Sequence, residues 1–322
     1  MKIAQRNSNP FVFSDSNKRY YTYDYYLRRT FGDKVAKLPV DAGFTCPNID
    51  GRCGRGGCIY CSSRGSGDFA GPPRLSVTEQ LTMGATRMAS KWDTGKYIAY
   101  FQAHTNTYAP LPVLREKFEE ALSFPGVVGL NIATRADCLE PDVVDYLAEL
   151  SCRTVLTVEL GLQSAHDETA ARINRGHTWA QFVAGYERLR RAGDRINICV
   201  HTILGLPGEN DDMMLGTARR VAALHPEQVK LHLLYVLHGT QLGEMYAAGD
   251  YVPLERERYV RLVADTLELL PPDVVIARLT GDGAPGDLLA PLWSRRKVTV
   301  INDVDKLLFS RGSMQGLRWQ GD

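Results

Sequence analysis

Short apolar runs alternate with longer segments of helical periodicity along most of the chain. The apolar runs are rich in β-branched residues and predict strands, whereas the segments between them predict helices. We expect strands at residues 35–40, 97–101, 127–132, 154–160, 196–204 and 229–236. We expect helices at residues 76–91, 112–123, from 141 onward, 179–191, 211–224 and 254–269. Ser76 and Glu79 have the spacing of a capping box and mark where the first of these helices begins.

This order predicts an α/β fold built from six strand–helix pairs with parallel crossovers. Six such pairs favour a partial (β/α)₆ barrel of the TIM type over an open, doubly wound sheet, although strand order cannot be deduced from periodicity. We divide the chain into three parts. These are a helical, aromatic N-terminal segment (1–34), a barrel core (35–270), and a C-terminal extension of strands and loops (271–322).

Composition places the chain among ordinary globular proteins, since 44% of its 322 residues are hydrophobic and 23% are charged. The net charge of +1 neither requires nor excludes a nucleic-acid partner. The sequence has no apolar run of about 18 residues and no signal-peptide pattern at its start. We therefore expect a cytoplasmic protein. In that reducing compartment its seven cysteines predict a metal site and not a disulfide framework.

Four of the seven cysteines, Cys46, Cys53, Cys58 and Cys61, fall in one glycine-rich loop, CPNIDGRCGRGGCIYC. Zinc takes four ligands in a closed tetrahedron, and four thiols are present. A [4Fe–4S] cluster held by only three thiolates would leave one iron open to an external ligand. The residues leave both metals possible, as well as a loop that binds no metal.

The segment from Asp41 to Phe69 resembles the cluster loop of radical-SAM proteins of the YhcC/YtqA type, which are related to the Elongator catalytic subunit. The resemblance extends from Tyr20 to about Gly316. It implies an enzyme that uses a [4Fe–4S] cluster to cleave S-adenosylmethionine reductively to a 5′-deoxyadenosyl radical. Within the loop, residues 43–71, it implies Cys46, Cys58 and Cys61 as ligands and the aromatic Tyr60 beside the last of them. Cys53 departs from the family pattern, and we leave it off the ligand set.

Polar or glycine-rich segments follow all six predicted strands, where the active sites of (β/α) barrels lie. The resemblance implies cofactor contacts in these segments, together with Tyr60, from Gln102, Arg135, Asp137, Glu159, Gln163, Arg175, Gly205 and Gly208. Gln102 lies where the family contacts the methionine moiety, but the usual Gly-Gly-Glu is absent. A surface ion pair for Arg135 and a helix-capping role for Arg175 and His177 are the structural alternatives. No residue is identified as a catalytic acid, base or hydrogen-atom donor.

Two of these side chains carry a further expectation. A buried Glu159 needs a partner, either a bound ribose hydroxyl or a cationic side chain. Asn197, Cys199 and His201 share one face of their strand, which lines a substrate cavity if it faces the barrel interior and otherwise belongs to the core.

Three hypotheses cover the substrate. The resemblance implies a tRNA-modifying enzyme acting on the wobble-uridine side chain, with an electron donor such as flavodoxin or ferredoxin. Arg19, Arg28, Arg29 and the Trp293–Lys297 segment supply basic and aromatic groups for RNA, unless they are simply solvated surface. The near-neutral charge instead favours a small-molecule or protein substrate. The third hypothesis is a non-enzymatic, zinc-bound nucleic-acid-binding or scaffold protein, which needs all four clustered cysteines.

Overall fold

The computed structural model describes residues 9–65, 69–91, 94–281, 283 and 286–321. The chain forms two compact units, each made of separate stretches of sequence. Unit 1 consists of Met1–Tyr26, Gln163–Ile173 and Val200–Asp322, and unit 2 consists of Leu27–Leu162 and Asn174–Cys199. Parts of two motifs, residues 66–68 of the cysteine loop and 282, 284 and 285 of the extension, lie outside the described residues.

A parallel sheet forms the framework of the fold. Its first four strands are β1 (Ala36–Val40), β2 (Tyr97–Phe101), β3 (Val127–Thr134) and β4 (Val155–Gln163). Neighbours in this series pair in parallel, so that Leu38 of β1 lies opposite Ala99, and Ala99 lies opposite Leu130. The strand order continues with β5 (Ile196–Leu204), β6 (Gln228–Leu233) and β8 (Val275–Arg278), and β6 and β8 are also parallel.

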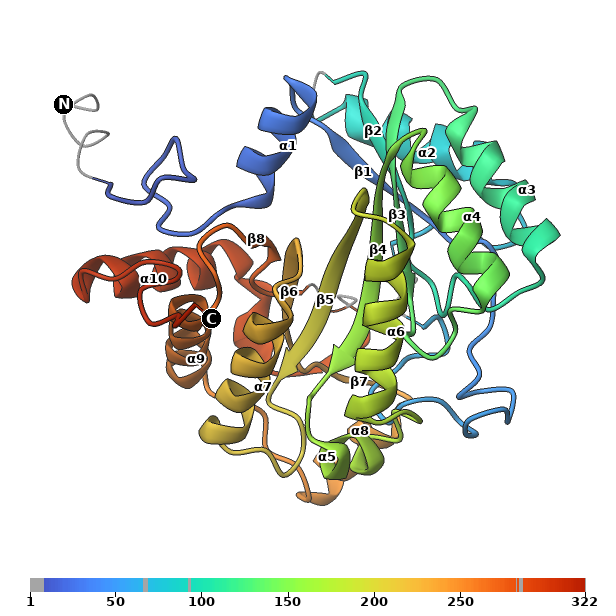
Figure 1. Cartoon of the computed structure of the whole chain (residues 1–322). Coiled ribbons are helices and arrows are strands. Elements are labelled where there is room, and N and C mark those ends of the chain that lie inside the picture. Colours follow the sequence, from blue (N-terminus) through green and yellow to red (C-terminus); the bar gives the residue numbers. More distant parts are fainter. Residues whose placement is uncertain (1–8, 66–68, 92–93, 282, 284–285, 322) are drawn as a thin grey trace. The chain divides into compact units, whose positions relative to one another are not determined.

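Helices that follow the strands cover one face of β1–β4 in unit 2 (Figure 1). They are α2 (Val77–Ala89), α3 (Leu111–Leu122), α4 (Pro141–Ser151) and α6 (Trp179–Ala192). The predicted capping box is present at α2, where Ser76 Oγ accepts from the Glu79 N–H at 3.1 Å. Phe118 of α3 packs edge-on against Phe101 of β2, with the ring centroids 4.8 Å apart, and both are fully buried. These apolar contacts hold the helical layer on the sheet.

In unit 1, α7 (Asp211–Leu224) and α9 (Arg256–Leu269) pack on each other, and α9 also packs on α10 (Lys297–Ser310). This arrangement is visible in Figure 1. The remaining helices are short: α5 (Asp167–Arg172), α8 (Gln241–Ala248) and the 3₁₀ helix η2 (Leu292–Arg295). Two further strands, β7 (Val236–Leu237) and β9 (Leu288–Ala290), form a separate antiparallel pair. Among the described residues, no helix is both long and apolar enough to cross a membrane.

The structure confirms the predicted strands and helices up to residue 224 to within a few residues, and three later or terminal predictions need correction. The strand expected at 229–236 breaks after Leu233, and Val236 belongs to β7. The extension is more than strand and loop, because it contains the helix α10 and supplies a seventh strand, β8, to the sheet. In the N-terminal segment, α1 (Tyr23–Phe31) is the helical part of the described residues 9–34.

Candidate functional site

The cysteine loop of unit 2 starts at the end of β1 and is fixed by its own backbone hydrogen bonds. The Ile49 N–H donates to the Cys46 carbonyl at 2.8 Å, and the Cys61 N–H donates to the Cys58 carbonyl at 3.0 Å. The Thr105 N–H donates to the Thr45 carbonyl at 3.2 Å, which ties the loop to the segment after β2. The loop therefore presents its thiols at the carboxyl ends of the first strands, as the sequence predicts.

The four thiols of the loop are not equivalent. Cys58 is buried, Cys46 and Cys61 are half-buried, and Cys53 is exposed. The Cys53 thiol lies 3.7 Å from a carboxylate oxygen of Asp137. Among the described residues, no three Cys, His, Asp or Glu side chains are placed to hold a single metal ion. Cys53 thus differs from the other three thiols in its exposure and in its contact with Asp137.

Two arginines carry positive charge next to these thiols. The Arg135 guanidinium, whose side chain is only 3% exposed, donates to both oxygens of Asp137 at 2.9 and 2.8 Å. It also donates to the Arg175 carbonyl at 2.8 Å. Burial alone would raise the pKa of Asp137, but the hydrogen bonds and charge of Arg135 outweigh it and lower that pKa. Arg135 is thus a buried, paired cation and not the surface ion pair that we considered.

Arg175 follows α5 and is buried beside the same loop. Its guanidinium donates to the Gly161 carbonyl at 2.6 Å, while its Nε has no partner among the described residues. His177 contacts the same carbonyl at 3.3 Å, and burial followed by the Arg175 charge lowers its pKa to about 3, so the imidazole is neutral. The helix-capping alternative is wrong for both residues, because Thr178 caps α6.

The electrostatics of the site favour a thiolate at Cys58. A hydrogen bond from Cys61 lowers the pKa of Cys58 to about 5 against the effect of burial, and the charge of Arg175 lowers it further. The same hydrogen bond, followed by burial, raises the pKa of Cys61. Tyr60, predicted to lie beside the site, forms a side-chain hydrogen bond with Cys58, and burial raises its pKa. A cationic pocket around thiols suits a cluster whose ligands are thiolates.

Glu159 lies on β4 with its side chain fully buried. The Asn131 amide of β3 donates to its carboxylate at 2.7 Å, and the Lys37 ammonium of β1 lies 3.3 Å from the same oxygen. Lys37 also lies over the Tyr100 ring, 4.8 Å from its centroid. Of the two partners that we expected for a buried Glu159, the structure supplies the cationic side chain.

The other predicted contacts occupy the ends of further strands. The Gln102 N–H donates to the carbonyl of Val40 at 3.3 Å, so Gln102 lies where β1 and β2 end. In unit 1, Gln163 ends β4 in a left-handed conformation (φ 69°). A Cβ on Gly205 would lie 3.0 Å from Leu254, and one on Gly208 would overlap Arg172. Both glycines therefore permit close packing against side chains of their own unit.

The predicted polar face of β5 is only partly buried. Asn197 donates to the carbonyl of Leu156 at 3.0 Å, and Cys199 is fully buried. In unit 1, the half-buried rings of His201 and His232 lie 5.3 Å apart. The substrate cavity that we expected on this face of β5 stays a prediction.

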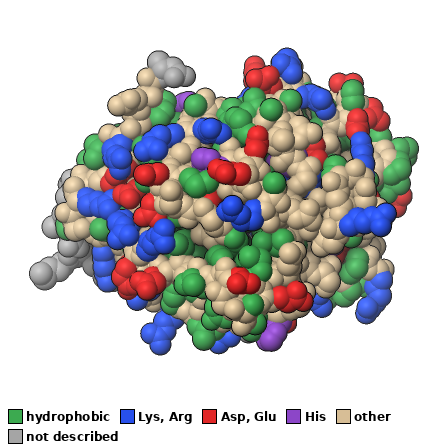
Figure 2. Space-filling model, turned by 90° about the horizontal axis from the view of Figure 1, so that it is seen from below, with side chains coloured by type: hydrophobic (Ala, Val, Ile, Leu, Met, Phe, Trp, Pro, Cys, Tyr) green, Lys and Arg blue, Asp and Glu red, His purple; other side chains and the backbone are tan. Residues whose placement is uncertain are grey.

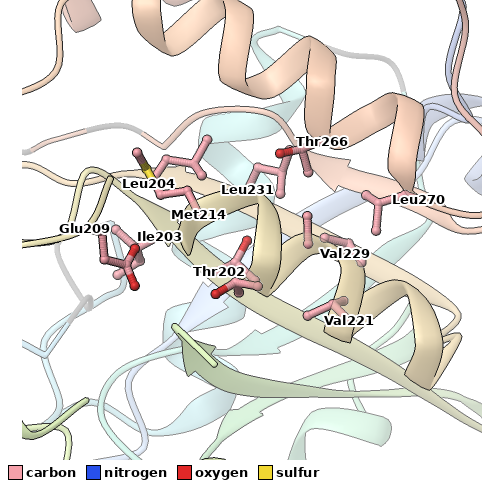
Figure 3. Close-up of a pocket in the computed structure, with 12 residues that line it drawn as sticks. Thr202, Ile203, Leu204, Glu209, Met214, Val221, Val229, Leu231, Thr266 and Leu270 are labelled. Carbon is pink, nitrogen blue, oxygen red and sulfur yellow. The ribbon is translucent and has the colours of Figure 1, made fainter. Parts of the chain in front are cut away.

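A cavity in unit 1 is too small to be a substrate or cofactor site. Figure 3 shows that it is lined by side chains of β5, β6, α7 and α9, among them Thr202 and Thr266, and by Glu209 from the loop between β5 and α7. The space that it leaves for solvent is about that needed by one water molecule. Glu209 accepts a hydrogen bond from Ser164, and burial raises the pKa of its carboxyl.

Comparison with known proteins decides the family. Residues 48–221 match the model of the Radical SAM superfamily, and residues 226–309 match that of the Radical_SAM C-terminal domain. The chain belongs to the radical SAM superfamily. It is accordingly a radical SAM enzyme, and the non-enzymatic zinc hypothesis is not carried further. Cys46 lies two residues before the matched segment begins.

Individual relatives agree with this assignment. The chain is 50% identical to the uncharacterized protein YtqA of Bacillus subtilis (strain 168) over 313 residues, 97% of each protein. It is 27% identical over 158 residues to a tRNA uridine(34) acetyltransferase of Methanocaldococcus jannaschii, which covers 48% of this chain and 28% of that protein. The solved structure of the archaeal Methanocaldococcus infernus Elp3, with an N-terminal deletion, matches at a TM-score of 0.66 and 18% identity, covering 87% of this chain and 64% of that one. The predicted fold class is confirmed.

The site contains residues that the sequence did not reveal. Asn48 contacts the Cys58 sulfur, and Lys37 and Asn131 contact Glu159, yet none of the three was predicted. Lys37 offered one signal, since a charged residue inside the short apolar strand AKLPV indicates a buried partner.

Proposed function

We propose that this radical SAM enzyme holds a [4Fe–4S] cluster through Cys46, Cys58 and Cys61 and acts on the wobble-uridine side chain of tRNA. One observation carries the cluster assignment: three thiols of one fixed loop lie beside two buried guanidinium groups. The residues fit the cluster, because Arg175 Nε is a buried N–H donor that lacks a partner within the described chain, and the sulfurs of a cluster accept hydrogen bonds. Bound there, the cluster supplies the electron that cleaves S-adenosylmethionine to methionine and a 5′-deoxyadenosyl radical.

The protein's own part is binding and orientation. Arg135 and Asp137 fix each other, and Arg135 fixes the backbone at Arg175. Arg175 then brings its charge to the sulfur atoms. In the proposal, Gln102 at the end of β2 binds a polar group of S-adenosylmethionine, and an electron donor such as flavodoxin or ferredoxin supplies the electron. Burial of Cys58 and Arg175 keeps water away from the reacting atoms.

The cluster proposal is tested by anaerobic reconstitution with iron and sulfide, followed by reduction with dithionite in the presence of S-adenosylmethionine. We expect 5′-deoxyadenosine and methionine in equal amounts, with a 5′-deoxyadenosine yield at least one hundredfold above that of a Cys58→Ala variant. Wild-type protein that contains the cluster and yields no 5′-deoxyadenosine would contradict the proposal.

The tRNA substrate is supported by the similarity to a protein named tRNA uridine(34) acetyltransferase. Exposed arginines can contact phosphates, and the structure exposes Arg28 and Arg29 in the last turn of α1 and Arg295 and Arg296 around η2. Trp293 is a poor stacking platform for a base, because its Nε1 donates to the Leu254 carbonyl at 3.1 Å and its ring packs on Tyr259.

The substrate is tested by mass spectrometry of tRNA nucleosides from cells that lack the gene. We expect an altered modification at the wobble uridine, restored by the wild-type gene and not by the Cys58→Ala variant. An unchanged nucleoside profile would reject tRNA and favour the second candidate, a small-molecule or protein substrate. That candidate is supported by the net charge of +1 and by the intermixing of acidic and basic side chains on the face drawn in Figure 2.

A further inference from the structure

The side chain of Asn48 joins the cysteine loop to the segment that follows α5, both within unit 2. Asn48 is fully buried, and its Nδ2 lies 3.7 Å from the Cys58 sulfur and donates to it. The same Nδ2 donates to the backbone carbonyl of Asn174. In return, the Asn174 amide donates to the Gly57 carbonyl of the cysteine loop at 2.7 Å. The two asparagines thus hold the loop and the segment together from both sides.

The surroundings fix which way the Asn48 amide points. A backbone carbonyl accepts hydrogen bonds and donates none, so the group facing Asn174 must be the NH₂ and not the oxygen. On the other side, a Cβ on Gly54 or on Gly176 would lie 2.5 or 2.4 Å from Asn48 Oδ1. Only glycine at these two positions leaves room for the amide. Asn48 is consequently packed in one orientation, with an N–H directed at a sulfur atom.

We propose that Asn48 is a positioning residue that raises the reduction potential of the cluster by donating a hydrogen bond to the sulfur of Cys58. Reduction adds negative charge that the ligand sulfurs share, and an N–H directed at one of them stabilises the reduced form. This inference rests on the proposed role of Cys58 as a ligand and deepens the proposed function.

The test is a redox titration of the reconstituted protein, followed by electron paramagnetic resonance of the reduced cluster. Asn48→Asp has the shape of asparagine, so it fits between Gly54 and Gly176, but it removes the donor and adds negative charge. We expect the ratio of reduced to oxidised cluster at a fixed potential to fall at least tenfold, which is about 59 mV for one electron. Asn48→Ala, which is neutral and smaller, is expected to shift the potential in the same direction by less.

Asn174→Gly is the matched control. It retains the backbone carbonyl and suits the left-handed conformation of residue 174 (φ 53°), but it removes the side chain that holds the loop. We expect its loaded fraction to have the wild-type potential, even if less cluster is incorporated. An unchanged potential in both Asn48 variants would overturn the inference. The inference would also be overturned if Asn48→Ala incorporates no cluster while Asn174→Gly does, because Asn48 would then be needed to assemble the cluster. A wild-type protein without a cluster would instead overturn the proposed function.

Discussion

In unit 2, two buried guanidinium groups lie beside cysteine thiols, whereas in unit 1 a carboxylate, Glu209, lies among hydroxyl groups and apolar side chains. Arg135 is neutralised by Asp137, whereas the Arg175 guanidinium donates to the Gly161 carbonyl, and its Nε has no partner among the described residues. The thiol region of unit 2 therefore has positive charge that an anionic ligand would balance. Glu209 has no such surplus around it, and burial raises its pKa. A buried charged side chain indicates a binding site when neighbouring groups of opposite charge do not neutralise it.

The largest expected effect concerns the thiols. Cys46→Ala, Cys58→Ala and Cys61→Ala should each lose the iron–sulfur absorbance and reduce 5′-deoxyadenosine production at least one hundredfold. Cys53→Ser should keep both, because Cys53 is exposed and contacts Asp137. Iron analysis and chromatography of the reaction products measure these effects. A Cys53→Ser protein without iron would show that our ligand set is wrong.

The next effect contrasts ion pairs of the two units in the metal-free protein. Asp137→Ala leaves the buried Arg135 without its carboxylate and should lower the free energy of unfolding by about 3 kcal/mol. Arg258→Ala in unit 1 removes an exposed pair with Asp211 and should cost less than about 1 kcal/mol. Urea denaturation followed by circular dichroism measures both. Equal losses of unfolding free energy in the two variants would contradict the contrast between the units.

Lys37→Met tests the buried pair on the sheet of unit 2. It removes the Lys37 ammonium from the fully buried Glu159, and should cost about 2 kcal/mol of unfolding free energy. Adding Glu159→Gln removes the buried negative charge and should recover most of that loss. A double variant that is no more stable than Lys37→Met would mean that Lys37 acts through packing, for instance on Tyr100.

The smallest effect is the pH dependence from Glu209. Its pKa is raised in the folded protein above the ordinary value of 4.5. The folded state therefore holds this proton more tightly than the unfolded state. The contribution of Glu209 to the free energy of unfolding is complete below pH 4.5 and is lost as the pH rises through the folded pKa. Glu209→Gln should make the protein more stable than wild type at pH 7.5, and the gain should vanish towards pH 4. A gain that does not depend on pH would assign the effect to packing.

Local sequence patterns predicted most of the fold. The strand Tyr97–Phe101 and the helix Asp211–Leu224 begin and end where their patterns do. Helix α10 was missed because its first turn contains the β-branched run VTVI, which on its own favours a strand. The strand β8 is only four residues long, and its partner β6 lies far away in sequence. Pairing between strands far apart in sequence leaves no pattern in the residues of either strand.

The candidate site could be predicted in its chemistry but not in its contacts. Cysteine spacing indicated a metal site, and the family resemblance selected three of the four cysteines. The hydrogen bonds that position them join residues far apart in sequence: Asn48 and Asn174 are 126 positions apart, and Lys37 and Glu159 are 122 apart. Packing of the sheet brings these residues together, so their roles became visible only in the structure.

The most direct test of the central claim is whether three thiolates leave one iron of the cluster open to S-adenosylmethionine. Reduced, reconstituted protein should give an electron paramagnetic resonance spectrum that changes when S-adenosylmethionine is added, and Cys53→Ser should behave in the same way. A spectrum that S-adenosylmethionine leaves unchanged, or anaerobically purified protein that contains zinc and no iron, would contradict the account.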